Sequence, residues 1–153
     1  MKGVALSINN YPLKNSAILD SGTTLHIFNQ ISRFLNFRAA PEGDFVWAGD
    51  HKIPILGYGE VDIKIKQQIG GTRLMRLYNV ALCKGIVCNL VSLCILCQKG
   101  YYWDTKPRTT LIRRSDNSVL YSLEEKHNQF VLEHILDDID QAAFFTRRNK
   151  FNT

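Results

Sequence analysis

In the segment Val61–Lys66, every odd position is a β-branched aliphatic residue and every even position is charged. Successive side chains of a β-strand point to opposite faces, so this alternation predicts a strand with one face buried and the other in water. Gly70 and Gly71 then form a turn, and Arg73–Tyr78 is predicted to return as the next strand. The middle of the chain is therefore predicted to be β-structure.

Shorter extended segments precede and follow this hairpin. A second hairpin is predicted over Phe45–Leu56, with a four-residue polar turn at Gly49–Lys52. Two segments interrupt the pattern: Phe28–Phe37, a short helix or irregular loop, and Ser92–Gln98, a short helix ended by Gly100. Many short strands predict an all-β fold with one or two short helices, as a closed barrel or a sandwich. The further predicted strands are Val4–Ile8, Ser16–Asp20, Tyr101–Trp103, Thr109–Arg113 and Val119–Leu123.

The chain is long enough for one domain with its own core, because it has 153 residues and 45% of them are hydrophobic. We expect residues 1–136 to form that domain. The segment 137–153 differs in composition, with an acidic run at Asp137–Asp140 and a basic run at Arg147–Lys150. It is expected to be a helical or disordered C-terminal tail.

Several classes of protein are disfavoured by the sequence. No apolar run approaches the roughly 20 residues that span a bilayer, and the N-terminus has no secretory signal pattern. We therefore expect no membrane partner, a cytoplasmic location and reduced thiols. The cysteines lie between Cys83 and Cys97, too close together for a zinc finger, so buried packing thiols are favoured, Cys94 among them. No cofactor or metal is expected.

The net charge of +5 is a weak indication of nucleic-acid binding. A groove for a single strand interleaves its cations with aromatic rings. The basic side chains of Lys64, Lys66 and Arg73 are not interleaved in the sequence with the aromatic run Tyr101–Trp103. A solvated basic face is the favoured interpretation, and a barrel that contacts RNA is the third hypothesis for function.

The segment Ile18–Thr24 carries the strongest indication of chemistry. Two apolar residues place Asp20 at the end of a buried strand, and the small pair Ser21 and Gly22 allows a sharp turn after it. We expect the carboxylate to point into a cleft with the hydroxyl groups of Ser21 and Thr23 beside it. Asp-Ser-Gly alone is often only a turn, but its flanking residues make this the local arrangement of an aspartic protease.

The chemistry of such a protease needs two carboxylates that lie a few ångströms apart and share one proton. The chain has one Asp-Ser-Gly turn, and none of its other aspartates stands in an equivalent setting. Two copies can complete the pair by two-fold symmetry, each supplying Asp20. In that dimer we expect a buried Ser21 to bond across the axis and Thr23 to donate to the outer oxygen of Asp20.

Four segments form an ordered pattern along the chain. Ile18–Ile27 contains Asp-Ser-Gly followed by a histidine, and Val46–Gly59 contains an Ala-Gly-Asp turn followed by Gly-x-Gly. Leu77–Leu82 reads Leu-Tyr-Asn-Val-Ala-Leu, and Asn89–Tyr101 reads Asn-Leu-Val-Ser-Leu before a final Gly-Tyr. In this order and spacing the segments resemble the protease region in the Pol polyprotein of copia-type LTR retrotransposons, over roughly residues 16–132.

The resemblance implies a retropepsin-like closed β-barrel that is active as a homodimer and cleaves the Gag-Pol polyprotein in a virus-like particle. It makes Asp20 the catalytic aspartate, within a turn completed by Ser21, Gly22 and Thr23. It makes Asn89–Leu93 an inner strand behind that turn. It also implies a flap, a mobile hairpin that closes over substrate, with the residues Asp50, His51, Lys52, Ile53 and Gly57.

A second hypothesis, from another class of function, keeps the predicted fold but assigns the protein no catalytic activity. A domesticated or decayed β-barrel module would bind protein without cleaving it. The altered order of the flap turn, Ala48-Gly49-Asp50, favours this alternative. The two hypotheses differ in whether Asp20 meets a second carboxylate.

Overall fold

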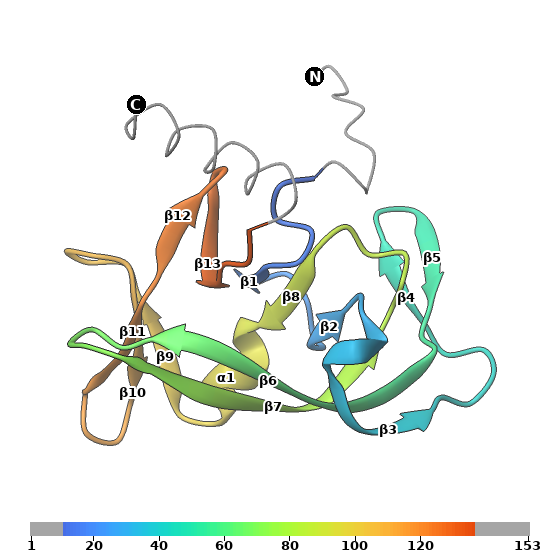
Figure 1. Ribbon diagram of the computed structural model, residues 1–153, viewed down its shortest axis with the longest axis horizontal. Coiled ribbons are helices and arrows are strands. Elements are labelled where there is room, and N and C mark those ends of the chain that lie inside the picture. Colours follow the sequence, from blue (N-terminus) through green and yellow to red (C-terminus); the bar gives the residue numbers. More distant parts are fainter. Residues whose placement is uncertain (1–10, 137–153) are drawn as a thin grey trace, which may run out of the picture.

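Two long strands, β6 (Gly57–Lys66) and β7 (Thr72–Leu82), form an antiparallel hairpin that runs across the molecule (Figure 1). The aliphatic residues of the alternating segment, Val61, Ile63 and Ile65, have no exposed surface. The charged residues between them are half-buried or exposed. The predicted strand and its return strand are therefore confirmed.

The structure is a computed structural model that describes residues 11–136. The predicted strand before Asp20, the three predicted strands after residue 100 and the short helix before Gly100 are confirmed. No helix in this part of the chain is long and apolar enough to cross a membrane. Besides β6 and β7 the elements are β1 (Ala17–Asp20), β2 (Ile27–Phe28), a 3₁₀ turn (Ile31–Arg33), β3 (Phe34–Ala39), β4 (Phe45–Ala48), β5 (His51–Pro54), β8 (Asn89–Ser92), α1 (Leu93–Gln98), β9 (Tyr101–Asp104), β10 (Thr110–Arg113), β11 (Val119–Ser122), β12 (Glu124–Lys126) and β13 (Gln129–Glu133).

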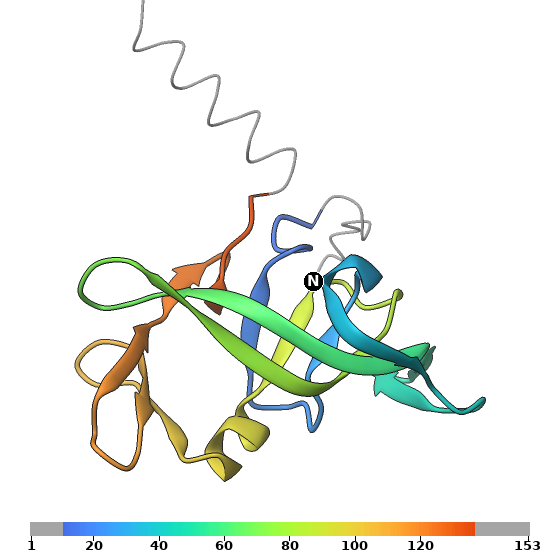
Figure 2. The ribbon, with the colours of Figure 1, turned by 60° about the horizontal axis from the view of Figure 1, so that its bottom comes forward.

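Eight strands form one sheet in the order β12-β13-β1-β8-β2-β7-β6-β3, with β1 and β8 side by side in its interior (Figure 2). β1 is parallel to β8 and antiparallel to β13, so both of its backbone edges are paired. A three-stranded sheet, β11-β10-β9, and the β4–β5 hairpin complete the fold. The all-β class is confirmed. Within the described residues the outer strands β12 and β3 do not pair with each other, so the closed barrel stays a prediction.

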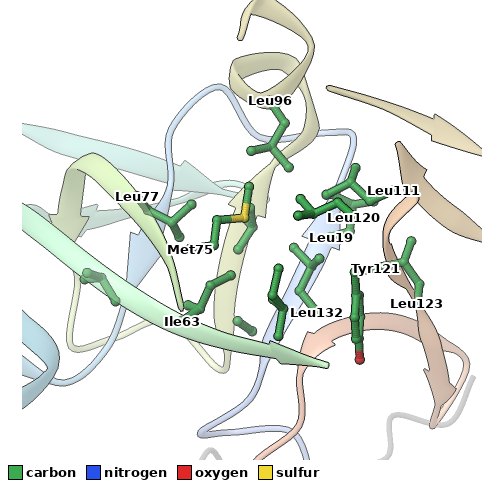
Figure 3. Packing of buried hydrophobic residues seen from close by; sticks show 14 of the residues in the cluster. Leu19, Ile63, Met75, Leu77, Leu96, Leu111, Leu120, Tyr121, Leu123 and Leu132 are labelled. Atoms are coloured by element: carbon green, nitrogen blue, oxygen red, sulfur yellow. The ribbon is translucent and has the colours of Figure 1, made fainter. Parts of the chain in front are cut away.

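The main core lies between the β6–β7 hairpin, β1, α1 and the β9–β11 sheet (Figure 3). Leu19 from β1 packs there with Ile63, Leu96 and Leu111, each of which is at least 95% buried. Full burial of such a side chain contributes about 1.5–3 kcal/mol. Because Asp20 directly follows Leu19, the packing of this core fixes where the carboxylate leaves the interior.

The segment Phe28–Phe37, predicted as a short helix or irregular loop, contains one 3₁₀ turn and then enters β3. β3 pairs with β6 through an irregular register, and Asn36 there has a φ of +52°. Asparagine is among the few residues that adopt this conformation readily. A bulge breaks the two-residue alternation of side chains, which is why the sequence does not read as a strand.

β12 and β13 are absent from the strands predicted from sequence. β13 pairs with β1 and brings in Glu133, which is 8% exposed. Its carboxylate accepts hydrogen bonds from Arg33 Nη2 at 2.7 Å and from the backbone N–H of Lys64 at 2.6 Å. The predicted strand Val4–Ile8 and the predicted tail 137–153 lie outside the described residues.

The cysteines divide into two environments. Cys83 and Cys88 are buried, and burial raises the pKa of each thiol to about 11. Cys94 is exposed and Cys97 is half-buried, because α1 turns only Leu96 fully into the core. The interpretation of all four as buried packing thiols is therefore wrong for Cys94.

Replacing Ile63 by alanine should lower the free energy of unfolding by about 3 kcal/mol, since it removes a fully buried side chain. The matched change Ile69→Ala, at a position 90% exposed, should alter it by less than about 0.5 kcal/mol. Denaturant unfolding of both variants measures the difference. Equal effects would contradict the orientation of β6.

Candidate active site

Asp20 is the last residue of β1, which pairs with β8 along one edge and with β13 along the other. Ile18 and Leu19 before it are 6% and 5% exposed, whereas Asp20 itself is half-buried. In the parallel pairing of β1 with β8, Asp20 lies opposite Ser92. The carboxylate therefore leaves the sheet at the end of a buried strand, as predicted.

The turn after Asp20 holds its carboxylate by a backbone hydrogen bond. The N–H of Gly22 donates to Asp20 Oδ1 at 2.8 Å. A Cβ at position 22 would lie 3.3 Å from that same oxygen, which is tighter than ordinary van der Waals contact. Glycine therefore lets the backbone come close enough to fix the carboxylate.

The predicted role of Thr23 in the turn needs correction. Thr23 Oγ1 donates to the carbonyl of Leu25 at 3.0 Å, not to Asp20, so this hydroxyl closes the turn on itself. Ser21 is exposed in the single chain, at the outer end of the turn beyond the sheet, and its bond across a dimer axis stays a prediction. In this chain, then, neither hydroxyl is hydrogen-bonded to the carboxylate.

The turn is braced from β8 by Ser92, a residue that the sequence analysis did not single out for the site. Ser92 Oγ donates to the carbonyl of Thr23 at 2.8 Å and accepts from the N–H of Ile95 at 3.3 Å, which caps α1. The N–H of Ser92 donates to Nδ1 of His26 at 2.9 Å. The only sequence signal for this arrangement is the serine placed directly before the short helix.

His26 is 1% exposed, at the position just before β2. Burial, followed by the nearby charge of Lys99, lowers the pKa of His26 to about 4. The imidazole is therefore neutral at pH 7, and its Nδ1 is free to accept the hydrogen bond from Ser92.

A cleft of about 500 Å³ opens beside the turn. Asp20, Gly22 and Thr23 line it together with the four residues of β4. Asp20 is the only carboxylate among the described residues that line this cleft. Its remaining lining residues are mostly apolar: Thr24, Leu25, Ile27, Phe45, Val46, Trp47, Ala48, Ile86 and Leu90.

The hairpin predicted as the flap is formed by β4 and β5, and β4 is its cleft-side strand. Ala48 pairs with His51, so the turn consists of two residues, Gly49 and Asp50, and not of the four predicted. Gly49 has a φ of +64°, which glycine adopts without strain. Because this glycine makes a tight turn possible, His51 and Lys52 continue the strand.

The predicted flap residues lie in different environments. The side chains of Asp50 and His51 are 100% and 86% exposed at the end of the hairpin, and none of the five predicted flap residues lines the cleft. Ile53 is half-buried and packs in an apolar cluster at the base. Gly57 is buried and is the first residue of β6, where a Cβ would collide with Phe37. Gly57 therefore belongs to the fixed base of the flap.

Two aromatic residues of β4 were missed as site residues. Phe45 and Trp47 line the cleft and stack edge-to-face, with ring centroids 5.4 Å apart. The Lys52 ammonium lies 4.5 Å from the centroid of the Phe45 ring and 5.4 Å from that of the Trp47 ring. Trp47 is nevertheless 62% exposed. Alternate aromatic residues in a strand beside a glycine turn were the signal available in the sequence.

Fold and site together define an all-β domain that presents one carboxylate on a braced turn at the edge of an apolar cleft. Residues 17–101, more than half of the chain, match the model of the family described as Pol polyprotein, beta-barrel domain. The chain belongs to this family. The Pol polyprotein origin predicted from sequence is therefore confirmed. No curated protein and no solved structure gives a significant match.

The pKa of His26 predicts a stability that depends on pH. Because its pKa is about 4 in the fold and 6.5 in the unfolded chain, the unfolded chain takes up the proton first as pH falls. The contribution of neutral His26 to the free energy of unfolding is complete above pH 6.5 and is lost as pH falls toward 4. The loss should be on the order of 3 kcal/mol at most.

Denaturant unfolding at several pH values between 4 and 7.5 measures this dependence. His26→Asn retains an oxygen that can accept from Ser92 but does not titrate, so its profile should be flatter. Parallel profiles for the two proteins would contradict the account.

Proposed function

We propose that this chain is an aspartic endopeptidase of retrotransposon origin, which acts as a homodimer and cleaves the Gag-Pol polyprotein. The observation that carries the proposal is Asp20, fixed by the Gly22 N–H at the end of a buried strand and open to an apolar cleft. Membership of the Pol polyprotein β-barrel family supports the polyprotein as the substrate. The proposed place of action is the cytoplasm, within a virus-like particle.

The chemistry follows from two carboxylates that approach each other. Like charges at close range cannot both ionise, so the pair holds one proton. One Asp20 takes a proton from water, which attacks the scissile carbonyl, and the other Asp20 donates its proton to the carbonyl oxygen. The titration belongs to the pair and not to either residue.

The exposure of the turn supports a two-fold dimer as the active form. Asp20 is the sole carboxylate among the described residues of its cleft, and in the proposed dimer the second is Asp20 of the other copy. Ser21 and Gly22 are exposed at the end of the turn. A two-fold interface brings the same patch of both copies together, and an exposed Ser21 is available to bond across the axis.

The cleft and the hairpin support a peptide as substrate. Leu25, Ile27 and Leu90 offer apolar walls to the side chains of an extended chain. The β4–β5 hairpin is a separate two-stranded sheet, and just after it the N–H of Leu56 donates to the carbonyl of Leu82 in β7, an arrangement that suits the hairpin to open and close over a peptide. The proposal includes the retropepsin-like barrel as the form that the domain takes in this dimer.

Asp20→Asn should lower the rate at which a recombinant copia-type Gag-Pol polyprotein is cleaved at mildly acidic pH by at least about 100-fold. Asparagine has nearly the same shape but cannot hold or release the shared proton. Asp116→Asn, in the β10–β11 turn far along the chain from the cleft, is the matched control and should retain activity. Cleavage at equal rates by wild type and Asp20→Asn would remove Asp20 from the mechanism.

A second candidate function is a β-barrel module that binds protein without cleaving it. The observation in its favour is the apolar cleft with one carboxylate and the 62% exposed Trp47 at its rim. The two candidates predict different masses in solution. Light scattering should give a dimer if the protease proposal holds, and a stable monomer at all concentrations would favour the binding module.

A further inference from the structure

We infer that His26 is a positioning residue, whose neutral imidazole holds the turn of Asp20 in place through Ser92. The catalytic part of this inference rests on the proposed protease function. The structural part, a relay from a buried histidine to the turn, stands without it.

The relay consists of two hydrogen bonds in series. His26 Nδ1 accepts from the N–H of Ser92 at 2.9 Å, and Ser92 Oγ donates to the carbonyl of Thr23 at 2.8 Å. Ser92 is also the register partner of Asp20 in the pairing of β1 with β8. One residue of β8 is therefore fixed by His26 on one side and holds the turn after Asp20 on the other.

Burial gives the first bond of the relay, from Ser92 to His26, its importance. His26 is 1% exposed and Ser92 has no exposed surface, so water does not replace a lost partner. A side chain without an acceptor at position 26 leaves the Ser92 N–H unpaired in the interior. The N–H then has to move to find a partner, and the Ser92 hydroxyl moves with it.

The relay depends on the protonation state of the imidazole. Only neutral histidine can accept at Nδ1, because both ring nitrogens of the charged form are donors. When His26 takes up a proton, its Nδ1 carries a hydrogen that faces the N–H of Ser92. The hydrogen bond between the two residues is then lost. The turn keeps its own bonds, from Gly22 to Asp20 and within Thr23–Leu25, but the Ser92 hydroxyl that reaches it is no longer fixed by His26.

His26 takes up a proton less readily because it is buried and lies near one cation, Lys99. It lines a cavity of about 280 Å³ together with Lys99, next to α1, and with Arg73, Arg76 and Tyr78 of β7. Tyr101 of β9 is the remaining titratable group in that lining, and no carboxylate of the described residues is part of it. Burial and the charge of Lys99 lower the pKa of His26 to about 4.

The relay therefore limits the pH range in which the site can act. At mildly acidic pH, where a carboxylate pair shares its proton, His26 is still neutral and the turn is held. Below a pH of about 4 the relay breaks, so kcat should fall there even if the carboxylate pair remains correctly protonated. Substrate affinity depends mainly on the walls of the cleft, so KM should change less.

Two substitutions separate positioning from simple packing. His26→Leu fills the space without an acceptor and should lower kcat by about 10- to 100-fold with a smaller change in KM. His26→Asn supplies an oxygen acceptor that does not titrate, so it should restore much of kcat and move the acid limb of the pH profile to lower pH. His127→Asn, an exposed histidine whose φ of +49° suits asparagine, is the matched control and should behave as wild type. Identical pH profiles for His26→Asn and wild type would overturn the catalytic part.

A measurement without activity tests the relay itself. In the Asp20→Asn variant the carboxylate no longer titrates, so the ¹H–¹⁵N resonances of Ser92 and Thr24 should shift together with the ring protons of His26, with a midpoint near pH 4. Adding His26→Asn should remove this shared transition. A Thr24 resonance that does not follow His26 overturns the relay. If wild type and Asp20→Asn cleave equally, the proposed function fails, and the resonances still decide the relay.

Discussion

The parallel pairing of β1 with β8 is the constraint on which the rest of the site depends. Both strands lie in the interior of the eight-stranded sheet, and Leu19 and Val91 are buried in its core. A strand paired on both edges and packed by apolar side chains has one available register. That register sets Asp20 beside Ser92 and ends β1 where its next residue leaves the sheet.

The turn after Asp20 is held by hydrogen bonds within the chain, while its outer end is exposed. Gly22, Thr23 and Ser92 each satisfy a polar group at the turn, so the carboxylate is held in a defined direction. Ser21, however, is left exposed by the residues that the structure describes. A rigid carboxylate on an uncovered surface is the geometry that a two-fold partner would complete. The proposed catalysis is therefore a property of two chains, each contributing a preorganised half.

Local patterns in the sequence identified the parts that local physics determines. The alternation in β6, the glycine turn before β7 and the sharp turn after Asp20 each arise within a few residues. The short helix was predicted for the same reason, since Ser92 caps it and Gly100 follows it. These features do not depend on partners far along the chain.

The parts that the sequence did not reveal depend on long-range contacts. β13 pairs with β1 across more than a hundred residues, and the bulged β3 is a strand only because β6 pairs with it. The role of His26 arises where β2 meets β8. Ser21 was predicted to be buried because the prediction assumed a partner chain, whereas the single chain leaves it exposed. The hairpin turn was predicted too long because polarity, and not the φ of Gly49, was used to set its length.

Cross-linking at position 21 measures the meeting of the two turns most directly. In a variant with serine at the two more accessible cysteines, Cys94 and Cys97, a Ser21→Cys thiol is the one thiol at the exposed end of the turn. A disulfide forms only when two Cα atoms approach to about 4.4–6.8 Å. We predict a disulfide-linked dimer on mild oxidation, and none when the added cysteine is at Ser118 in the β10–β11 turn. A Ser21→Cys chain that stays monomeric, or that cross-links no better than Ser118→Cys, would contradict a site built from two copies of Asp20.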